Sequence, residues 1–307
     1  MQFDLEQLRT LSAVAELGTL DAAATALHVT PSAVSQRLRA LETAAGRVLL
    51  VRSRPARPTA AGEAVLRLAR QVDLLAADTA AELAGESAPA SLGVAVNADS
   101  LATWFLPALA SLAGEVAVHL HREDEANTAR LLRAGTVVAA ITVDPAPVAG
   151  CAVTGLGTMR YRPMASRAFA ERWLPGGPTP EALARAPMLV FDRDDAKQHD
   201  YLAARAPGAE PPQTMVPSSP DFVAAIGLGF GWAMVADLQR PAAPELVELD
   251  PDFVDDVALY LQRWRLRSAS LDRLADAIVA GARERLAQGD RASPSELAPH
   301  TFGEPFS

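Results

Sequence analysis

Residues 18–66 read GTLDAAATALHVTPSAVSQRLRALETAAGRVLLVRSRPARPTAAGEAVL and carry the strongest structural signal in the chain. An alanine-rich segment begins at Thr19, which can cap a helix, and its small side chains allow another helix to pack closely. Thr30 can cap the next helix, with Pro31 at the first position, where the missing N–H costs nothing. Apolar residues at helical spacing also predict a helix over residues 4–17, so we expect three helices in the N-terminal region.

The helix that begins at Pro31 has two chemically different faces. Val34, Leu38 and Leu41 share one stripe, which predicts a side that faces the core. The opposite stripe carries short donors and acceptors and an arginine, which are side chains that can read base edges in the major groove. An ordinary solvent-exposed face would show the same pattern, so this stripe alone leaves both interpretations open. The residues expected to contact DNA from this helix are Thr30, Ser32, Ser35, Gln36, Arg37 and Arg39.

A basic turn follows this helix and favours DNA binding. Residues 48–51 are apolar and predict a strand, and residues 52–58 contain three arginines and two prolines. Such a turn is typical of a wing, a hairpin that places arginines against phosphates or in the minor groove. The wing residues expected to contact DNA are Arg52, Arg54 and Arg57.

The distribution of charge agrees with a DNA-binding head. The whole chain has a net charge of −9, which by itself argues against a nucleic-acid partner. Residues 1–60, however, hold seven arginines and five acidic residues, so this part carries +2 and the remainder −11. A basic head on an acidic body predicts that the head binds double-stranded DNA.

The same stretch resembles the N-terminal domain of LysR-type transcriptional regulators. The alanine pair, the run SAVSQRL..LE...G..L..R and the PT..G after the wing match that family at the same spacing across residues 18–66. Pro31 departs from the family, in which glutamine is common at this position, and this removes one base contact. The resemblance implies a winged helix-turn-helix DNA-binding domain at residues 1–58, with promoter DNA and RNA polymerase as partners.

Residues 59–85 predict a linker helix that pairs with a second copy of the chain. Thr59 can cap this helix, and apolar residues recur along it at alternating spacings of three and four, flanked by charges. This seam favours a dimerisation helix over a core helix of one domain. The family resemblance implies the same pairing in a homodimer or tetramer, and residues 85–91 predict a flexible hinge. The seam residues are Val65, Leu68, Val72, Leu75 and Thr79.

From residue 91 the chain alternates short apolar strands with helices, which predicts an α/β fold with parallel strands. The pattern starts again after Met159, so we expect a two-lobed effector domain like that of periplasmic binding proteins. Lobe I should comprise residues 91–160 and 267–300, and lobe II residues 161–266. The expected strands are 92–96, 116–120, 137–143, 188–191, 213–216 and 232–235, with helices that include 100–112, 126–134 and 270–286.

Polar residues stand where ligands of such folds bind. Ligands of open α/β sheets lie at the carboxyl ends of strands, close to helix N-termini. Helix capping is an alternative explanation for each of these residues, because Asn, Asp and Ser are common caps. The residues expected to bind the effector are Asn97, Asp99, Ser100, Glu123, Asp124, Asp192, Ser218 and Ser219.

This set of side chains predicts a ligand that carries both charges. Hydroxyls and helix N-termini favour an anionic group, whereas carboxylates favour a cationic group, so we expect an amino acid, above all a basic one. The α-carboxylate would meet Ser100, and Asp99, Glu123, Asp124 or Asp192 would receive the ammonium or guanidinium group.

A second resemblance leads to the same effector. The stretches AVNADSLATWFLPAL, EDE, FD..DD and V.SS..FV......G are similar to the LysG/ArgP branch of LysR-type regulators, over residues 4–286. Members of this branch respond to lysine or arginine and control a basic amino-acid exporter. Residues 227–237, GLGFGWAMVAD, depart from the branch. A different small-molecule effector, or a replication-origin or nucleoid DNA-binding protein, remains an alternative.

Other classes of protein lack their sequence signals. The five histidines are scattered, and only His119 and His121 have a metal-ligand spacing, without visible partners. The glycine-rich residues 227–231 precede a strand instead of a phosphate-binding helix. We therefore expect no enzyme, metal or cofactor. One cysteine, Cys151, and the absence of a signal sequence or a long apolar run predict a cytoplasmic protein without a membrane segment.

Overall fold

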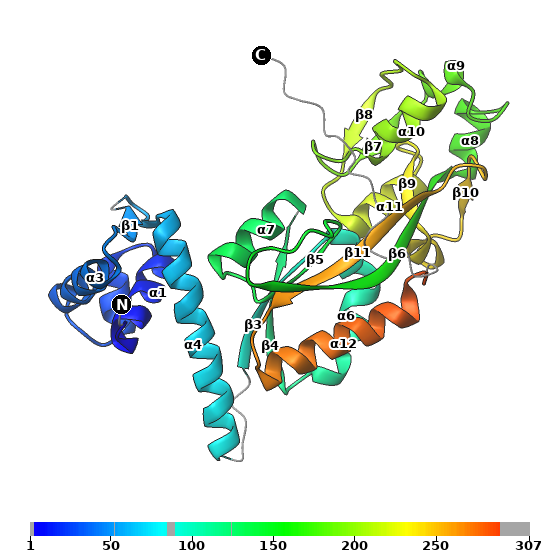
Figure 1. Cartoon of the computed structure of the whole chain (residues 1–307). Coiled ribbons are helices and arrows are strands. Elements are labelled where there is room, and N and C mark those ends of the chain that lie inside the picture. Colours follow the sequence, from blue (N-terminus) through cyan, green and yellow to red (C-terminus); the bar gives the residue numbers. More distant parts are fainter. Residues whose placement is uncertain (1–2, 52, 85–89, 124, 289–307) are drawn as a thin grey trace.

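The computed structural model describes residues 3–51, 53–84, 90–123 and 125–288. A small helical head, one long helix and an elongated two-lobed body follow one another along the chain (Figure 1). Arg52, Asp124 and the part of the expected lobe I beyond residue 288 lie outside these described residues, as does most of the expected hinge. Within the described residues, no helix is long and apolar enough to cross a membrane.

The head is a three-helix domain with a short two-stranded wing. Its elements are α1 (Leu5–Leu17), α2 (Leu20–Ala26), α3 (Pro31–Ala45), β1 (Leu50–Val51) and β2 (Arg57–Pro58). Thr19 and Thr30 each accept a hydrogen bond from a backbone N–H of the following helix, as their positions predicted. Val34, Leu38 and Leu41 lie in the head core, which confirms the predicted inner face of α3.

The wing is fixed to the head by close backbone approaches. The amide of Ala56 donates to the carbonyl oxygen of Gly18 at 2.7 Å, and Gly18 has a φ of +74°. Thr59 donates from Oγ1 to the carbonyl oxygen of Val48 at 2.7 Å and accepts from the amide of Gly62 at 3.0 Å. A Cβ on Gly62 would overlap the carbonyl oxygen of the residue that precedes β1, so only glycine fits there.

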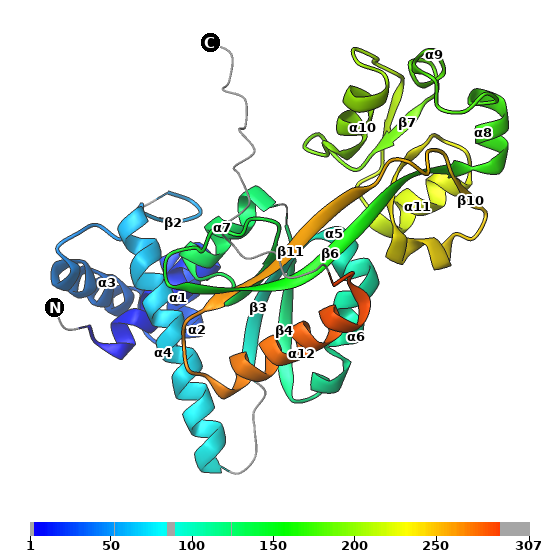
Figure 2. The same ribbon diagram turned by 45° about the vertical axis from the view of Figure 1, so that its right-hand side comes forward.

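The long helix α4 (Ala60–Ala84) belongs to the head at one end and lies along the body at the other (Figures 1 and 2). Val65, Leu66 and Ala69 are buried in the head core. Val65 is therefore part of the head, which corrects the predicted seam at its first position. Further along, Leu75 is 38% exposed and Thr79 is also exposed, so these seam residues are accessible in the single chain.

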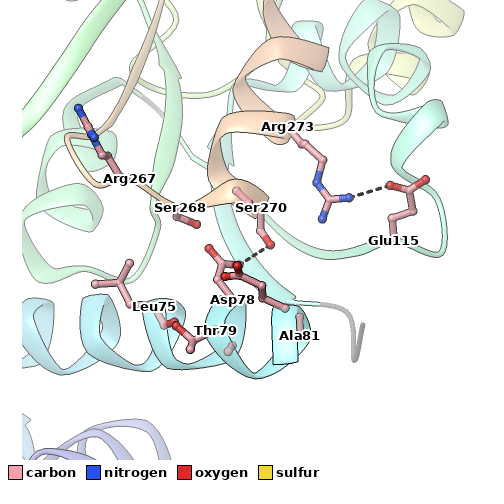
Figure 3. A pocket seen from close by; sticks show the side chains of 12 residues that line it. Leu75, Asp78, Thr79, Ala81, Glu115, Arg267, Ser268, Ser270 and Arg273 are labelled. Carbon is pink, nitrogen blue, oxygen red and sulfur yellow. Dashed lines mark hydrogen bonds and ion pairs between the residues drawn. The ribbon is translucent and has the colours of Figure 1, made fainter. Parts of the chain in front are cut away.

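Polar contacts join α4 to lobe I at two places, the end of α7 (Glu125–Ala134) and the start of α12 (Ala269–Arg285). Arg70 donates from Nη1 to the carbonyl oxygen of Ala134 at 3.1 Å. The next residue, Gly135, has a φ of +75°, and a Cβ there would lie 2.9 Å from Cα of Arg67. Ser270 at the start of α12 donates to Asp78 at 2.6 Å, beside a cavity between the two helices (Figure 3).

The body is built on a seven-stranded sheet in the order β10-β6-β11-β5-β3-β4, with β9 also paired to β6. β3, β4 and β5 are parallel, as predicted, whereas β6 and β11 are antiparallel to each other and form the longest ladder. The strands are β3 (Ala90–Val96), β4 (Val116–Arg122), β5 (Ala139–Thr142), β6 (Cys151–Ser166), β9 (Ala233–Ala236), β10 (Leu246–Glu248) and β11 (Asp255–Trp264).

The strands β6 and β11 run continuously from lobe I into lobe II (Figures 1 and 2). Neither strand is predicted by the sequence. The expected lobe boundary between residues 160 and 161 falls inside β6, so the chain crosses between the lobes as regular strand. The ladder extends from the pair Cys151 and Trp264 to the pair Tyr161 and Asp255.

Lobe II surrounds the far ends of these strands with short elements. β7 and β8 are parallel, as the alternation of strands and helices predicted. The elements are α8 (Arg167–Trp173), α9 (Pro180–Leu183), β7 (Met188–Val190), α10 (Lys197–Arg205), β8 (Gln213–Met215), α11 (Ser219–Gly227) and η3 (Asp237–Ala242).

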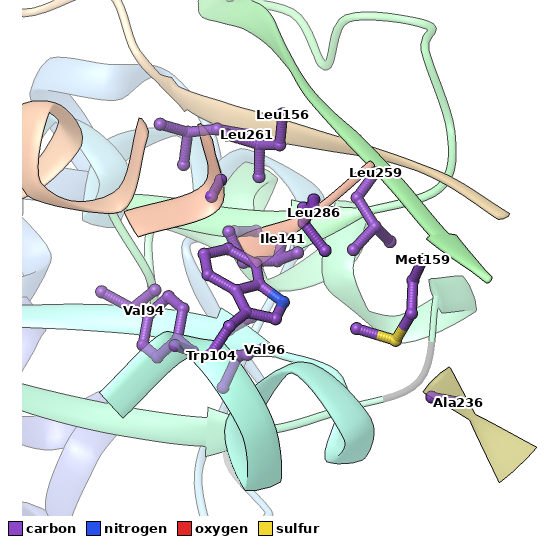
Figure 4. Packing of buried hydrophobic residues seen from close by; sticks show 14 of the residues in the cluster. Val94, Val96, Trp104, Ile141, Leu156, Met159, Ala236, Leu259, Leu261 and Leu286 are labelled. Atoms are coloured by element: carbon purple, nitrogen blue, oxygen red, sulfur yellow. The ribbon is translucent and has the colours of Figure 1, made fainter. Parts of the chain in front are cut away.

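The single helix expected at residues 100–112 is divided. It consists of α5 (Ala98–Ser100), the π-helical turn η1 (Leu101–Phe105), α6 (Leu106–Ala108) and the 3₁₀ turn η2 (Ala110–Leu112). Pro107 has no N–H to donate to an earlier turn, which disfavours a regular α-helix here. Trp104 in the π-helical turn packs among buried side chains that include Val94 and Ile141 (Figure 4). Turns of this kind are frequent at functional sites.

We predict that Gly62→Ala destabilises the head. The added methyl group would collide with a backbone carbonyl oxygen, and such overpacking costs about 1–3 kcal/mol. The thermal transition of the head should therefore move to lower temperature in calorimetry. The matched control is Gly176→Ala, where a Cβ meets no atom within 4 Å. Equal transitions for the two variants would contradict the close packing of α4 on the wing.

Candidate DNA interface and effector site

The outer face of α3 presents most of the predicted base-reading residues to solvent. Ser32, Gln36 and Arg39 are exposed. Thr30 is a helix cap, and its Oγ1 also lies 2.9 Å from Oγ of Ser32. Arg37 instead contacts α1, where its Nη1 lies 3.2 Å from the Glu6 carboxylate. Arg37 therefore helps to join α3 to α1. Ser35 is partly exposed on the same helix.

The wing adds exposed positive charge beside this face. Arg54 and Arg57 are exposed, at the turn and in β2. Together with the outer face of α3 they make a surface with exposed hydrogen-bonding side chains on a helix and arginines on a flanking hairpin. This is the arrangement in which phosphate contacts set the position of the protein and base contacts supply specificity.

A cavity of about 220 Å³ lies between the two lobes of the body. Two of the predicted carboxylates, Glu123 of lobe I and Asp192 of lobe II, lie in its wall. This volume is below that of typical pockets for drug-sized molecules, so the cavity suits a smaller ligand. The complete lining is Ala98, Arg122, Glu123, Phe191, Asp192 and Pro217.

Arg122 is a cavity residue that the sequence reasoning missed. Its Nη1 donates to the carbonyl oxygen of Pro217 at 3.0 Å, and its guanidinium lies 5.8 Å from the ring centroid of Phe191. Both contacts reach from lobe I to lobe II. A signal was present, because Arg122 is the last residue of β4 and the carboxyl ends of parallel strands carry ligand sites.

Asp99 forms a second polar connection between the lobes. Its Oδ1 accepts from Oγ of Ser219 at 2.8 Å and from Nε2 of Gln239 at 3.2 Å. Its Oδ2 accepts from the hydroxyl of Tyr161 at 2.9 Å. Ser219 and Gln239 are buried, so these bonds lie away from water. The structure thus brings Asp99 and Ser219 together, with two partners that the sequence did not indicate.

The remaining predicted residues show more local roles. Asn97 accepts from the amide of Ser100 at 3.1 Å and is the cap of α5. Ser100 is fully buried, and its hydroxyl has no hydrogen-bond partner among the described residues. Asp192 accepts from the amide of Asp194 at 2.9 Å, and Ser218 stands at the cap position of α11 without a capping bond from its side chain. Capping thus accounts for Asn97, whereas the Ser100 hydroxyl is left for another partner.

Reactive and metal-binding groups are not concentrated anywhere in the described part of the chain. It contains no group of three metal-ligating side chains. Cys151 is 2% exposed, and burial raises the pKa of its thiol, although Arg67 and Arg265 oppose the shift. A thiol with a raised pKa is a poor nucleophile, which agrees with a packing role for Cys151.

A winged helix-turn-helix joined by a long helix to a two-lobed body with an inter-lobe cavity defines a ligand-responsive DNA-binding regulator. Residues 5–63 match the family model of the bacterial regulatory helix-turn-helix protein, lysR family, and residues 85–283 match the LysR substrate binding domain. The chain therefore belongs to the LysR family of transcriptional regulators, as its sequence predicted.

The similar proteins are regulators of the LysG and ArgP type. The lysine export transcriptional regulatory protein LysG of Corynebacterium glutamicum is 42% identical over 91% of this chain and 98% of its own length. The crystal structure of ArgP from Mycobacterium tuberculosis has a TM-score of 0.86 at 43% identity, over 94% of this chain and all of that chain. Full-length LysG of C. glutamicum with bound effector Arg has a TM-score of 0.79 at 40% identity, over 93% and 100%. These relatives confirm a regulator of this branch and not an enzyme.

We predict different DNA-binding defects for α3 and for the wing. Gln36→Ala or Arg39→Ala should weaken binding to the preferred site by about 1–3 kcal/mol and relax base preference, because these exposed side chains would hydrogen-bond base edges. Arg54→Ala should weaken binding to every sequence and reduce the salt-dependence slope by about one. Titrations of specific and random DNA at several salt concentrations test this, with Arg172→Ala in lobe II as the control. Equal losses on both DNAs for the α3 variants would refute the base-reading face.

Proposed function

We propose that this regulator senses a basic L-amino acid, arginine or lysine, between the lobes of its body. The observation that carries the proposal is the inter-lobe cavity, with Glu123 and Asp192 from opposite lobes and Arg122 beside them. The arginine bound to the related LysG and the lysine-export name of that relative support the same class of effector. By the same reasoning, the gene it controls encodes a basic amino-acid exporter.

Charge balance favours a basic amino acid over a neutral one. The cavity and the neighbouring Asp99 together carry three carboxylates and one guanidinium, a net charge of −2. Arginine or lysine brings one carboxylate and two cationic groups, which leaves fewer charges of the site unpaired once the ligand covers them. The guanidinium of arginine could also donate two hydrogen bonds to one carboxylate, whereas the ammonium of lysine is a point charge.

Each group of the ligand has a candidate partner. The α-carboxylate would meet Arg122 of the cavity lining and, as the sequence predicts, the hydroxyl of Ser100, which has no hydrogen-bond partner among the described residues. The α-ammonium would meet Asp99, and the side-chain cation would pair with Glu123 or Asp192 through charge-assisted hydrogen bonds. Asp124 follows Glu123 directly, and Ser218 precedes the buried Ser219, so both belong to the same proposed site.

The ligand would act by favouring one arrangement of the lobes over another. Asp99 and Arg122 already bridge the lobes, so a ligand bound between them changes the free energy of closure. We propose that a homodimer, or a tetramer of paired dimers, carries this change through α4 to the heads on DNA. Such a regulator would work in the cytoplasm, where its DNA and RNA polymerase are.

Loss of a cavity carboxylate should lower the affinity for a cationic ligand more than the affinity for a neutral one. Titration calorimetry on the full-length protein should detect arginine binding, and Asp192→Asn or Glu123→Gln should weaken it about tenfold, because one charge-assisted hydrogen bond is lost. Citrulline, a neutral analogue of similar size, should be affected much less. Glu210→Gln, at an exposed site outside the cavity lining, is the control. No heat with arginine, lysine or ornithine, together with clear binding of an aromatic acid, would exclude this effector.

The linker helix should determine the oligomeric state. Leu75→Glu would place a charge in the proposed seam of α4, where it would lose water without gaining a partner. Light scattering should then show smaller assemblies, and operator binding should weaken because a monomer engages only one of the two half-sites. Ala80→Glu is the matched control, since Ala80 is exposed on α4 away from the seam. Unchanged assemblies for Leu75→Glu would remove this seam from the proposal.

A further inference from the structure

The chain contains a single lysine, Lys197, and it lies where lobe II meets the two crossing strands. Its Nζ is 4.3 Å from the ring centroid of Tyr161 on β6 and 3.3 Å from Oδ2 of Asp255 on β11. Tyr161 and Asp255 are paired residues of the β6–β11 ladder. One ammonium group therefore connects the first residue of α10 to both strands.

Tyr161 connects this ammonium group to the proposed effector site. The tyrosine is 3% exposed, with Lys197 over its ring and its hydroxyl donating to Oδ2 of Asp99 at 2.9 Å. A cation over the ring is attracted by the ring electrons and fixes the orientation of the phenol. In a poorly hydrated site it also strengthens the hydrogen bond that the hydroxyl donates.

The Asp99 carboxylate is held in place but is not saturated. An ionised carboxylate offers about four lone-pair sites, and three donors occupy Asp99 among the described residues. One acceptor site is left for a ligand. The α-ammonium of an amino acid is the group that would use it, because a carboxylate accepts charge-assisted hydrogen bonds from an ammonium group and Asp99 directly follows Ala98 of the cavity lining.

We infer that Lys197 is a positioning residue of the effector site, which acts through Tyr161 to orient Asp99 toward the α-ammonium of the ligand. This inference rests on the proposed function. A second effect has the opposite sign, because the positive charge of Lys197 would repel a cationic ligand. Asp255 lies 3.3 Å from that charge, and both side chains are about one-third exposed, so neutralisation and solvent screening weaken the repulsion. Positioning should therefore dominate.

Calorimetry with two ligands tests the inference on the full-length protein. Lys197→Met should weaken L-arginine binding by about threefold to tenfold, the range of one partly exposed cation–π contact. The affinity for 5-guanidinopentanoic acid, which is arginine without its α-ammonium, should stay the same. Lys197→Arg keeps a cation over the ring and should restore arginine binding to within about twofold. Arg172→Met, which removes a cation 5.2 Å from the Trp173 ring elsewhere in lobe II, is the matched control.

Because the protein has one lysine, labelling with [¹³Cε]lysine gives one assigned NMR signal. This signal should move when arginine is added, and much less with 5-guanidinopentanoic acid at equal occupancy. Unchanged arginine affinity in Lys197→Met, tighter arginine binding, or equal weakening of both ligands would overturn the positioning role while the proposed effector stands. Absence of arginine and lysine binding in the wild type would overturn both. Operator binding and thermal unfolding of each variant show that it is folded.

Discussion

The antiparallel ladder between β6 and β11 is the constraint on which the two-lobed body depends. It is the continuous structure shared by both lobes, and the strands beside it belong to one lobe or the other. A register shift between Leu259 and Tyr260 interrupts its regular pairing. Irregular pairing of this kind lets a ladder bend and twist locally. The relative position of the lobes, and with it the width of the cleft, is therefore set by the geometry of two strands.

The two lobes are joined across the cleft by hydrogen bonds whose side chains share partners. Asp99 and the buried Ser219 and Gln239 form a hydrogen-bonded set in which each side chain uses a partner from a distant part of the chain. A buried polar group without a partner costs about 1–3 kcal/mol, so opening the lobes is favourable only if water or a ligand replaces these bonds. The network therefore stabilises this arrangement of the lobes through bonds that a polar group could replace. An apolar interface of the same area would offer no such bonds.

The head could be predicted in detail because its signals are local. Caps at Thr19 and Thr30 and the stripe of Val34, Leu38 and Leu41 depend on residues within a few turns of one another. The crossing strands could not, since Gly155, Gly157 and Pro163 disturb the apolar pattern of β6 and its partner β11 comes much later in the chain. The carboxylates at strand ends could be proposed from the local sequence, whereas the contacts of Tyr161 and Gln239 with Asp99 join distant parts of the chain.

The attachment of α7 to α4 determines how a movement of lobe I reaches the head. The stretch of α4 that Arg67 and Arg70 attach to lobe I is the same stretch whose other face completes the core of the head. The head and lobe I therefore pack on opposite faces of the same turns of a 25-residue helix. A movement of lobe I at α7 reaches the head across the width of one helix, roughly 10 Å, and not along its length. The path from the body to the reading helix is thus short, although the chain between them is long.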